Sequence, residues 1–148
     1  SGAAPKNTGT PTIVPVVQST GCIVEVGAGT CIATLSASDP ANFPEGTNTL
    51  VVESITFTID ANVPVYTSIS FRAYYREKAF IIPLDGADMV PNGDGSRYTR
   101  SHTTSIKIYH NGIGDDGDLS LMSVRVLTPN DGTAVVGGVF VSGFYTSF

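Results

Sequence analysis

The most informative shortage in this 148-residue chain is one of charge, because only 14% of its residues are Asp, Glu, Lys or Arg. Globular domains usually carry about 25%. Thirteen acidic residues outnumber eight basic ones, which gives a formal net charge of −5. Nucleic-acid binding requires clustered Lys and Arg side chains that neutralise phosphates. The composition therefore predicts no direct contact with nucleic acid.

Three further absences narrow the class of protein. No apolar stretch approaches the roughly 20 residues that a transmembrane helix needs, so we expect no membrane insertion. No Asn-x-Ser/Thr sequon occurs, which disfavours a heavily glycosylated ectodomain. Tryptophan is missing too, so any aromatic platform for a carbohydrate would have to come from six Tyr and seven Phe.

What the sequence does contain is a series of strand-like segments. Residues 50–60 alternate cleanly, and four apolar side chains are expected on one face: Val51, Ile55, Phe57 and Ile59. Similar alternation marks four later segments, at residues 66–76, 103–109, 119–127 and 134–148. The run 79–83 is continuously apolar, which is typical of a strand covered on both faces.

These segments and the Gly- and Pro-rich turns between them predict an all-β fold with about eight or nine strands. We expect an antiparallel β-sandwich of jelly-roll or Greek-key type. Residues 1–20 are rich in Pro, Gly and Thr. They are interpreted either as a hinge or arm ahead of a single domain at 21–148, or as a first edge strand over residues 12–17.

Cys22 and Cys31 are the only cysteines. The glycine-rich segment between them favours a tight hairpin with a turn at Val26-Gly27, which would place the two cysteines directly opposite each other. Opposed residues in such a pair lie close enough for a disulfide. The alternative is a pair of reduced, buried cysteines that act as small apolar residues.

No set of catalytic residues stands out, and we expect the protein not to be an enzyme. His102 and His110 fall on the same face of one predicted strand. Eight residues of extended chain separate them by roughly 27 Å, so they cannot share a site. The Gly-x-Ser-x-Gly sequence of a nucleophile elbow does not occur.

Three carboxylates in a glycine-rich turn, Asp115, Asp116 and Asp118, are candidate oxygen ligands for calcium. Asp94 would join them if its loop lay at the same end of the sandwich. The alternative is an ordinary solvated turn, because Asp and Gly are common turn residues. No other cofactor is expected.

Two groups of residues are candidates for contact with a partner. Arg72, Tyr74 and Arg76 alternate along one predicted strand and could form an exposed strip. Arg97, Tyr98 and Arg100 fall in the long polar segment 84–101, and loops of that length are usually functional or mobile. The alternative for the first group is an ordinary solvent-facing strand.

The Pro/Thr/Gly-rich lead-in runs into an acidic, tryptophan-free β domain that ends on the strand-like segment 139–148. This arrangement resembles the protruding domain of small icosahedral virus capsid proteins. The resemblance implies a homo-oligomer, either a dimer or a trimer, on the virion surface or otherwise outside the cell.

It also implies contact with a host receptor or glycan through loops 84–101 and 111–118, which should point away from the hinge. A complete small jelly-roll capsid protein is a related option, although such proteins usually carry a basic N-terminal arm. The alternative is a carbohydrate-binding or adhesin module, with or without structural calcium.

Overall fold

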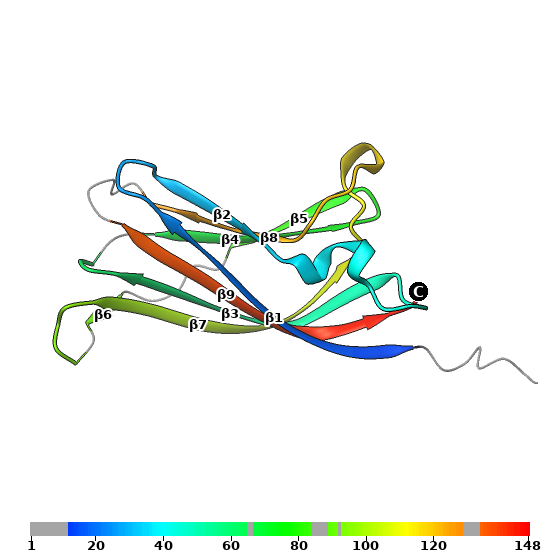
Figure 1. Cartoon of the computed structure of the whole chain (residues 1–148), viewed down its shortest axis with the longest axis horizontal. Helices are drawn as coiled ribbons and strands as arrows, with labels where there is room; N and C mark the ends of the chain where they lie inside the picture. The colour runs from blue at the N-terminus through cyan, green and yellow to red at the C-terminus, as the bar shows by residue number, and fades with distance from the viewer. Residues whose placement is uncertain (1–11, 65–66, 84–88, 92, 129–133) are drawn as a thin grey trace, which may run out of the picture.

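The computed structural model describes residues 12–64, 67–83, 89–91, 93–128 and 134–148. These residues form nine strands in two antiparallel sheets that pack face to face as a sandwich (Figure 1). The prediction of an all-β antiparallel sandwich is therefore confirmed. No helix in this part of the chain is long and apolar enough to cross a bilayer.

The larger sheet has five strands. In spatial order they are β1 (Ile13–Val24), β9 (Val135–Thr146), β3 (Thr49–Ala61), β7 (Tyr98–His110) and β6 (Val90–Pro91). The smaller sheet has four. In spatial order they are β2 (Thr30–Thr34), β8 (Ser123–Leu127), β4 (Ser68–Tyr75) and β5 (Lys78–Pro83). Three short 3-10 helices lie in the connections: η1 (Ser36–Ser38), η2 (Pro40–Asn42) and η3 (Asp115–Gly117).

The strand pairing is nested. β1 pairs with β9, β2 with β8, β3 with β7, and β4 with β5. A long antiparallel ribbon that is folded over on itself produces this order, which is the jelly-roll arrangement. The short strand β6 adds to the edge of the five-stranded sheet beside β7.

The core lies between the sheets and follows the alternation of the strands. Phe57 and Ile59 of β3 and Phe71 of β4 are among the side chains that are almost fully buried. A bulge between Val52 and Ser54 changes the phase of β3. Leu50 and Val52 therefore face the core before the bulge, as Ile55, Phe57 and Ile59 do after it. The prediction that Val51 shares the face of Ile55 is wrong for this reason.

β5 also departs from expectation. The continuously apolar run was expected to be covered on both faces, but β5 is an edge strand that pairs only with β4. Phe80 is 44% exposed and Ile81 is 56% exposed. An apolar run can occur at a sheet edge as well as in a sheet centre, and its composition does not distinguish the two positions.

The N-terminal segment contributes a full edge strand. β1 pairs with β9 along its whole length, from Ile13 opposite Thr146 to Val24 opposite Val135. The interpretation of residues 12–17 as an edge strand is therefore confirmed from Ile13 onward. The expected boundary after residue 20 falls inside this strand. Residues 1–11, the rest of the expected hinge, lie outside the described residues.

Cys22 and Cys31 form a disulfide with a Cα–Cα distance of 6.0 Å. The two cysteines do not face each other in a hairpin, because β1 and β2 belong to different sheets. Cys22 is opposite Gly137 of β9, and Cys31 is opposite Val126 of β8. The predicted hairpin is therefore wrong, and the disulfide joins the two sheets across one end of the sandwich.

Candidate functional site and contact surfaces

His110 is fully buried at the end of β7, and both of its ring nitrogens contact backbone groups. The Tyr74 N–H donates to Nδ1 at 3.0 Å, and Nε2 lies 2.9 Å from the Ser38 carbonyl oxygen. Because Nδ1 accepts a hydrogen bond, the ring proton is on Nε2, which donates to Ser38. His110 is therefore a neutral cross-link between β7, β4 and η1.

Burial lowers the pKa of His110 from 6.5 to about 4, although the hydrogen bond to Ser38 opposes this shift. A second ring proton would also point at the Tyr74 N–H, which already occupies Nδ1. Ser38 is itself fully buried. Its hydroxyl donates to the Leu35 carbonyl and accepts from the Met122 N–H. This hydrogen-bonded group fits a structural role for His110.

His102 lies eight residues earlier on β7 and is exposed. Its ring centroid is 5.9 Å from that of Phe57. Eight residues of strand correspond to roughly 27 Å, so the two imidazoles do not meet. The expectation that they cannot share a site agrees with these positions.

The predicted calcium ligands do not come together. Asp115 and Asp116 lie in η3 and Asp118 follows it, but no group of three or more His, Cys, Asp or Glu side chains within the described residues could hold a metal ion. Asp94 instead accepts hydrogen bonds from the backbone and hydroxyl of Ser96, which lower its pKa. The two loops also lie at opposite ends of the sandwich (Figure 1). The calcium site is therefore not supported.

Arg97, Tyr98 and Arg100 were expected in a loop, but β7 already begins at Tyr98. Arg97 precedes the strand and forms an ion pair with Asp60, with 2.6 Å between Nε and Oδ1. Tyr98 is half-buried beside them. The positive charge of Arg97 is therefore neutralised by Asp60.

Arg100 is also engaged internally. Its guanidinium lies 5.8 Å from the centre of the Phe57 ring, and Nη1 is 3.5 Å from the Thr67 carbonyl oxygen. The Arg100 side chain is half-buried. It therefore covers the end of the core, and the three residues do not form a free basic patch.

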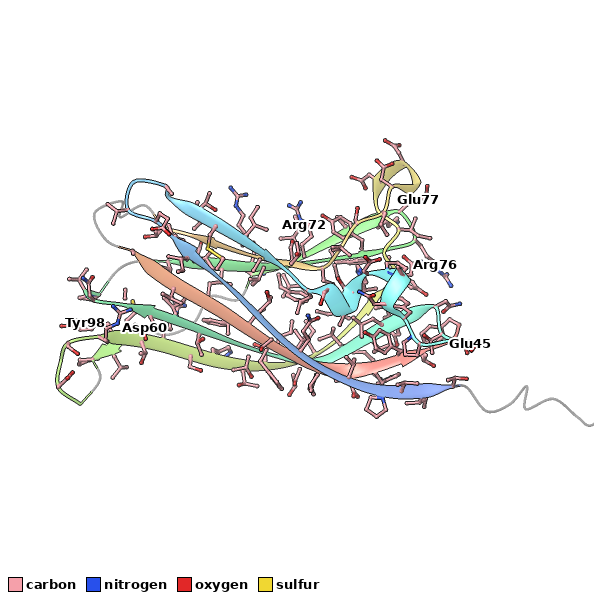
Figure 2. All side chains as sticks on the ribbon, viewed as in Figure 1. Glu45, Asp60, Arg72, Arg76, Glu77 and Tyr98 are labelled. Atoms are coloured by element: carbon pink, nitrogen blue, oxygen red, sulfur yellow. A yellow bond between two sulfur atoms is a disulfide. The ribbon has the colours of Figure 1, made fainter. Side chains whose placement is uncertain are left out.

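Arg72, Tyr74 and Arg76 do not form the expected strip. Arg72 is exposed on β4, but Tyr74 is half-buried and its ring packs close to Gly114. Arg76 lies in the turn after β4, with a φ of 51°, and its guanidinium is 5.0 Å from the Tyr75 ring. Figure 2 shows Arg76 at one end of the sandwich, Arg72 near its middle, and Asp60 and Tyr98 at the other end.

The loop around η3 lies at the end of the sandwich where β1 begins and the C-terminus lies (Figure 1). The prediction that loop 111–118 points away from the hinge is therefore wrong for this loop. A hollow of about 610 Å³ lies at the same end, and its walls include Phe43, Tyr75 and Phe148. The side-chain amide of Asn48, which lines this hollow, is hydrogen-bonded to the backbone of Phe148.

The outer surface of the five-stranded sheet exposes apolar side chains from β1 and β9. We call the following four residues the outer apolar face: Val17, Ile23, Val136 and Phe140. They are 65%, 51%, 43% and 44% exposed. Ile23 is directly opposite Val136, and Val17 is diagonal to Phe140, whose partner on β1 is Ser19. The alternation of the last strand predicts that Phe140 is on the face opposite Val139 and Val141, and the structure places those two valines in the core.

Sequence reasoning missed two residues, Ser38 and Arg125. Ser38 lies in a turn-rich segment, and nothing local indicates that its hydroxyl and carbonyl are buried. Arg125 lies on β8, opposite Ser70 and one diagonal step from Arg72. The alternation of residues 119–127 could have placed Arg125 on the outer face, but only the pairing of β8 with β4 shows that it lies beside Arg72.

No protein-family model matches this chain, and no curated protein matches it.

Proposed function

We propose that this domain is a non-enzymatic structural and attachment module, most simply a surface projection of a viral capsid. In this proposal it self-associates as a dimer or trimer and contacts a host receptor or glycan. Jelly rolls serve both as capsid domains and as lectins, so the fold suits this role without choosing between them. The choice depends on the surfaces.

The outer apolar face is the observation that carries the proposal. A strongly exposed apolar group on a folded domain is typical of an interaction surface. Val17 and Phe140 lie on the two outermost strands of that edge, β1 and β9, and their side chains are exposed. β1 itself is an edge strand with one unpaired side.

The disulfide supports the expected location. Disulfides persist in oxidising compartments and outside the cell, and they are rare in the cytosol. A bond between Cys22 and Cys31 is therefore in keeping with a virion surface or another extracellular setting.

Analytical ultracentrifugation tests the proposal. We expect a dimer or trimer at micromolar concentrations, and we expect Val17→Glu combined with Phe140→Glu to return the protein to a monomer. Leu119→Glu is the control, because Leu119 is 67% exposed but lies in the loop after η3. A wild-type protein that stays monomeric at high concentration would contradict the self-association.

A glycan-binding module is the second candidate, and one observation favours it. Arg72 and Arg125 are neighbours on the outer surface of the four-stranded sheet, and the strands of this sheet contain no Asp or Glu. Calcium has no part in this version, because the Asp115–Asp118 loop forms no metal-ligating group.

A further inference from the structure

The four-stranded sheet differs from the rest of the chain in charge. Strands β2, β4, β5 and β8 contain no Asp or Glu, and they contain three basic residues, Arg72, Lys78 and Arg125. The whole chain has a net charge of −5. The strands of this sheet are thus free of acidic residues, whereas β3 of the other sheet carries both Glu53 and Asp60.

Arg72 and Arg125 project from the same outer surface. Their neighbours along each strand, Phe71 and Ala73 on β4 and Val124 on β8, face the core, so the arginines face away from it. Figure 2 shows Arg72 pointing away from the five-stranded sheet. Arg72 is paired with Ser123, and Arg125 is paired with Ser70. The two arginines are thus diagonal neighbours, with Cα atoms about 7–8 Å apart.

These two guanidinium groups are available, whereas those of the other arginines are engaged. Arg97 is paired with Asp60, and Arg76 and Arg100 lie over aromatic rings. Within the described part of the chain, Arg72 makes no hydrogen bond or ion pair. Arg125 makes one long hydrogen bond, 3.4 Å from Nε to the Thr30 hydroxyl. Most of their donors therefore point into solvent.

A hollow of about 250 Å³ is lined by the two arginines. Six residues line it: Ile32, Ser70, Arg72, Ile81, Ser123 and Arg125. The arrangement offers two forked donors for an anion, two hydroxyls that can donate or accept, and two apolar walls.

We infer that this hollow binds an acidic saccharide, through a carboxylate or sulfate group held by Arg72 and Arg125. Guanidinium groups bind such planar or multi-oxygen anions bidentately, which an ammonium cannot do. The sugar hydroxyls suit Ser70 and Ser123, and the C–H faces of the ring suit Ile32 and Ile81. This inference rests on the proposed attachment role and names the class of ligand for it.

The rest of the surface favours a short ligand over a long polyanion. Acidic side chains flank the sheet at one end, where Glu77 and the Asp115–Asp118 loop lie. The loop between β6 and β7, which contains Asp94, lies at the other end of the sandwich (Figure 1). A nucleic acid that extended beyond the hollow would meet these charges and the net negative field of the domain. A single acidic sugar would not.

NMR titration of the isotope-labelled domain tests the inference. The probes are 3′-sialyllactose for the carboxylate, a heparin-derived disaccharide for the sulfate, and lactose as the neutral control. We expect saturable shifts confined to β2, β4, β5 and β8 with at least one acidic probe and none with lactose. Shifts that appear elsewhere, or no saturation with either acidic probe at millimolar concentration, would overturn the site.

Substitutions of the two arginines test whether they bind the acidic saccharide. Arg72→Ala combined with Arg125→Ala should raise Kd about tenfold or more, because charge-assisted hydrogen bonds are lost. Arg72→Lys combined with Arg125→Lys keeps the charge but loses the planar guanidinium, and it should weaken binding by an intermediate factor. Arg76→Ala combined with Lys107→Ala removes two charges elsewhere and should leave Kd unchanged. Equal weakening by this control pair would overturn the site.

Two further measurements separate the possible failures. A single-stranded oligonucleotide that bound to the same residues more tightly than both acidic saccharides would overturn the ligand class. Sedimentation of the same variants distinguishes this inference from the proposed function. A wild-type oligomer that binds no acidic saccharide contradicts the site alone, whereas a monomer that binds one contradicts only the self-association.

Discussion

At one end of the sandwich a covalent bond joins the two sheets, whereas at the other end a buried histidine does so. The disulfide connects Cys22 of β1 to Cys31 of β2, only nine residues apart in sequence. His110 of β7 instead bonds to the backbone of Tyr74 on β4 and of Ser38 in η1, at separations of 36 and 72 residues. One cross-link is local and covalent, and the other is long-range and polar.

The two ends of this small sandwich are therefore held by cross-links that respond to different conditions. A reductant acts on the disulfide end, and protonation acts on the histidine end. Between the two ends the apolar core is continuous. We therefore expect conditions that release one end to leave the other end largely intact, and the following predictions test this expectation.

The largest effect should come from His110→Ala. The substitution leaves the Tyr74 N–H and the Ser38 carbonyl buried without partners and opens a cavity. We expect a loss of about 4 kcal/mol in the free energy of unfolding, measured by chemical denaturation. His102→Ala on the same strand is the control, and it should change stability by no more than about 0.5 kcal/mol because His102 is exposed. Similar losses in both variants would contradict the role of His110.

The stability of the wild type should also fall with acid. The folded-state pKa of His110 is about 4, below its ordinary value of 6.5. Between these values the unfolded chain binds a proton that the folded chain excludes, so stability decreases as pH falls through this window. The loss from this group should be about 3 kcal/mol. This loss of stability should persist in His102→Ala and be absent in His110→Gln. If His110→Gln keeps the pH dependence of the wild type, His110 is not its source.

Removal of the disulfide should have a somewhat smaller effect. Cys22→Ala combined with Cys31→Ala frees a loop of nine residues in the unfolded chain, which costs about 2.5 kcal/mol by loop entropy. Thermal denaturation of this variant and of the wild type measures the difference. Reductant should lower the melting temperature of the wild type and leave that of the variant unaltered. If reductant lowers both equally, the disulfide is not the cause.

The smallest effect should come from Tyr145→Phe near the histidine end. The Tyr145 hydroxyl donates to the Ala37 carbonyl at 2.7 Å, and its ring packs on Phe43. Loss of the hydroxyl alone should cost about 1 kcal/mol. Tyr109→Phe is the control, because Tyr109 is 39% exposed. Indistinguishable denaturation midpoints for the two variants would argue against this contact.

The sequence predicted the fold class because alternation and turn residues are local signals. It predicted the faces of β4 and β9 correctly but misplaced Val51, since a bulge is set by the neighbouring strands. The run at β5 was assigned to an interior position because apolar composition does not reveal which strands pair. The cysteine pair was predicted to lie in one hairpin, whereas it links two sheets.

The contact surfaces were harder to predict for the same reason. Arg72 was singled out from its own strand, but its neighbour Arg125 comes from a strand more than fifty residues later in the sequence. Tyr74 shares its predicted face with polar residues, yet its ring lies close to Gly114. The Arg100 guanidinium likewise lies over the ring of Phe57. Long-range pairing decides which polar side chains remain exposed, and a single sequence does not contain it.

Hydrogen exchange of oxidised and reduced wild-type protein tests the independence of the two ends most directly. We predict that reduction at neutral pH accelerates exchange in the segment 21–32 around the disulfide, while the Tyr74 amide, which donates to His110, stays protected. Equal acceleration at both ends would contradict the account, because it would mean that the two ends open together as one cooperative unit.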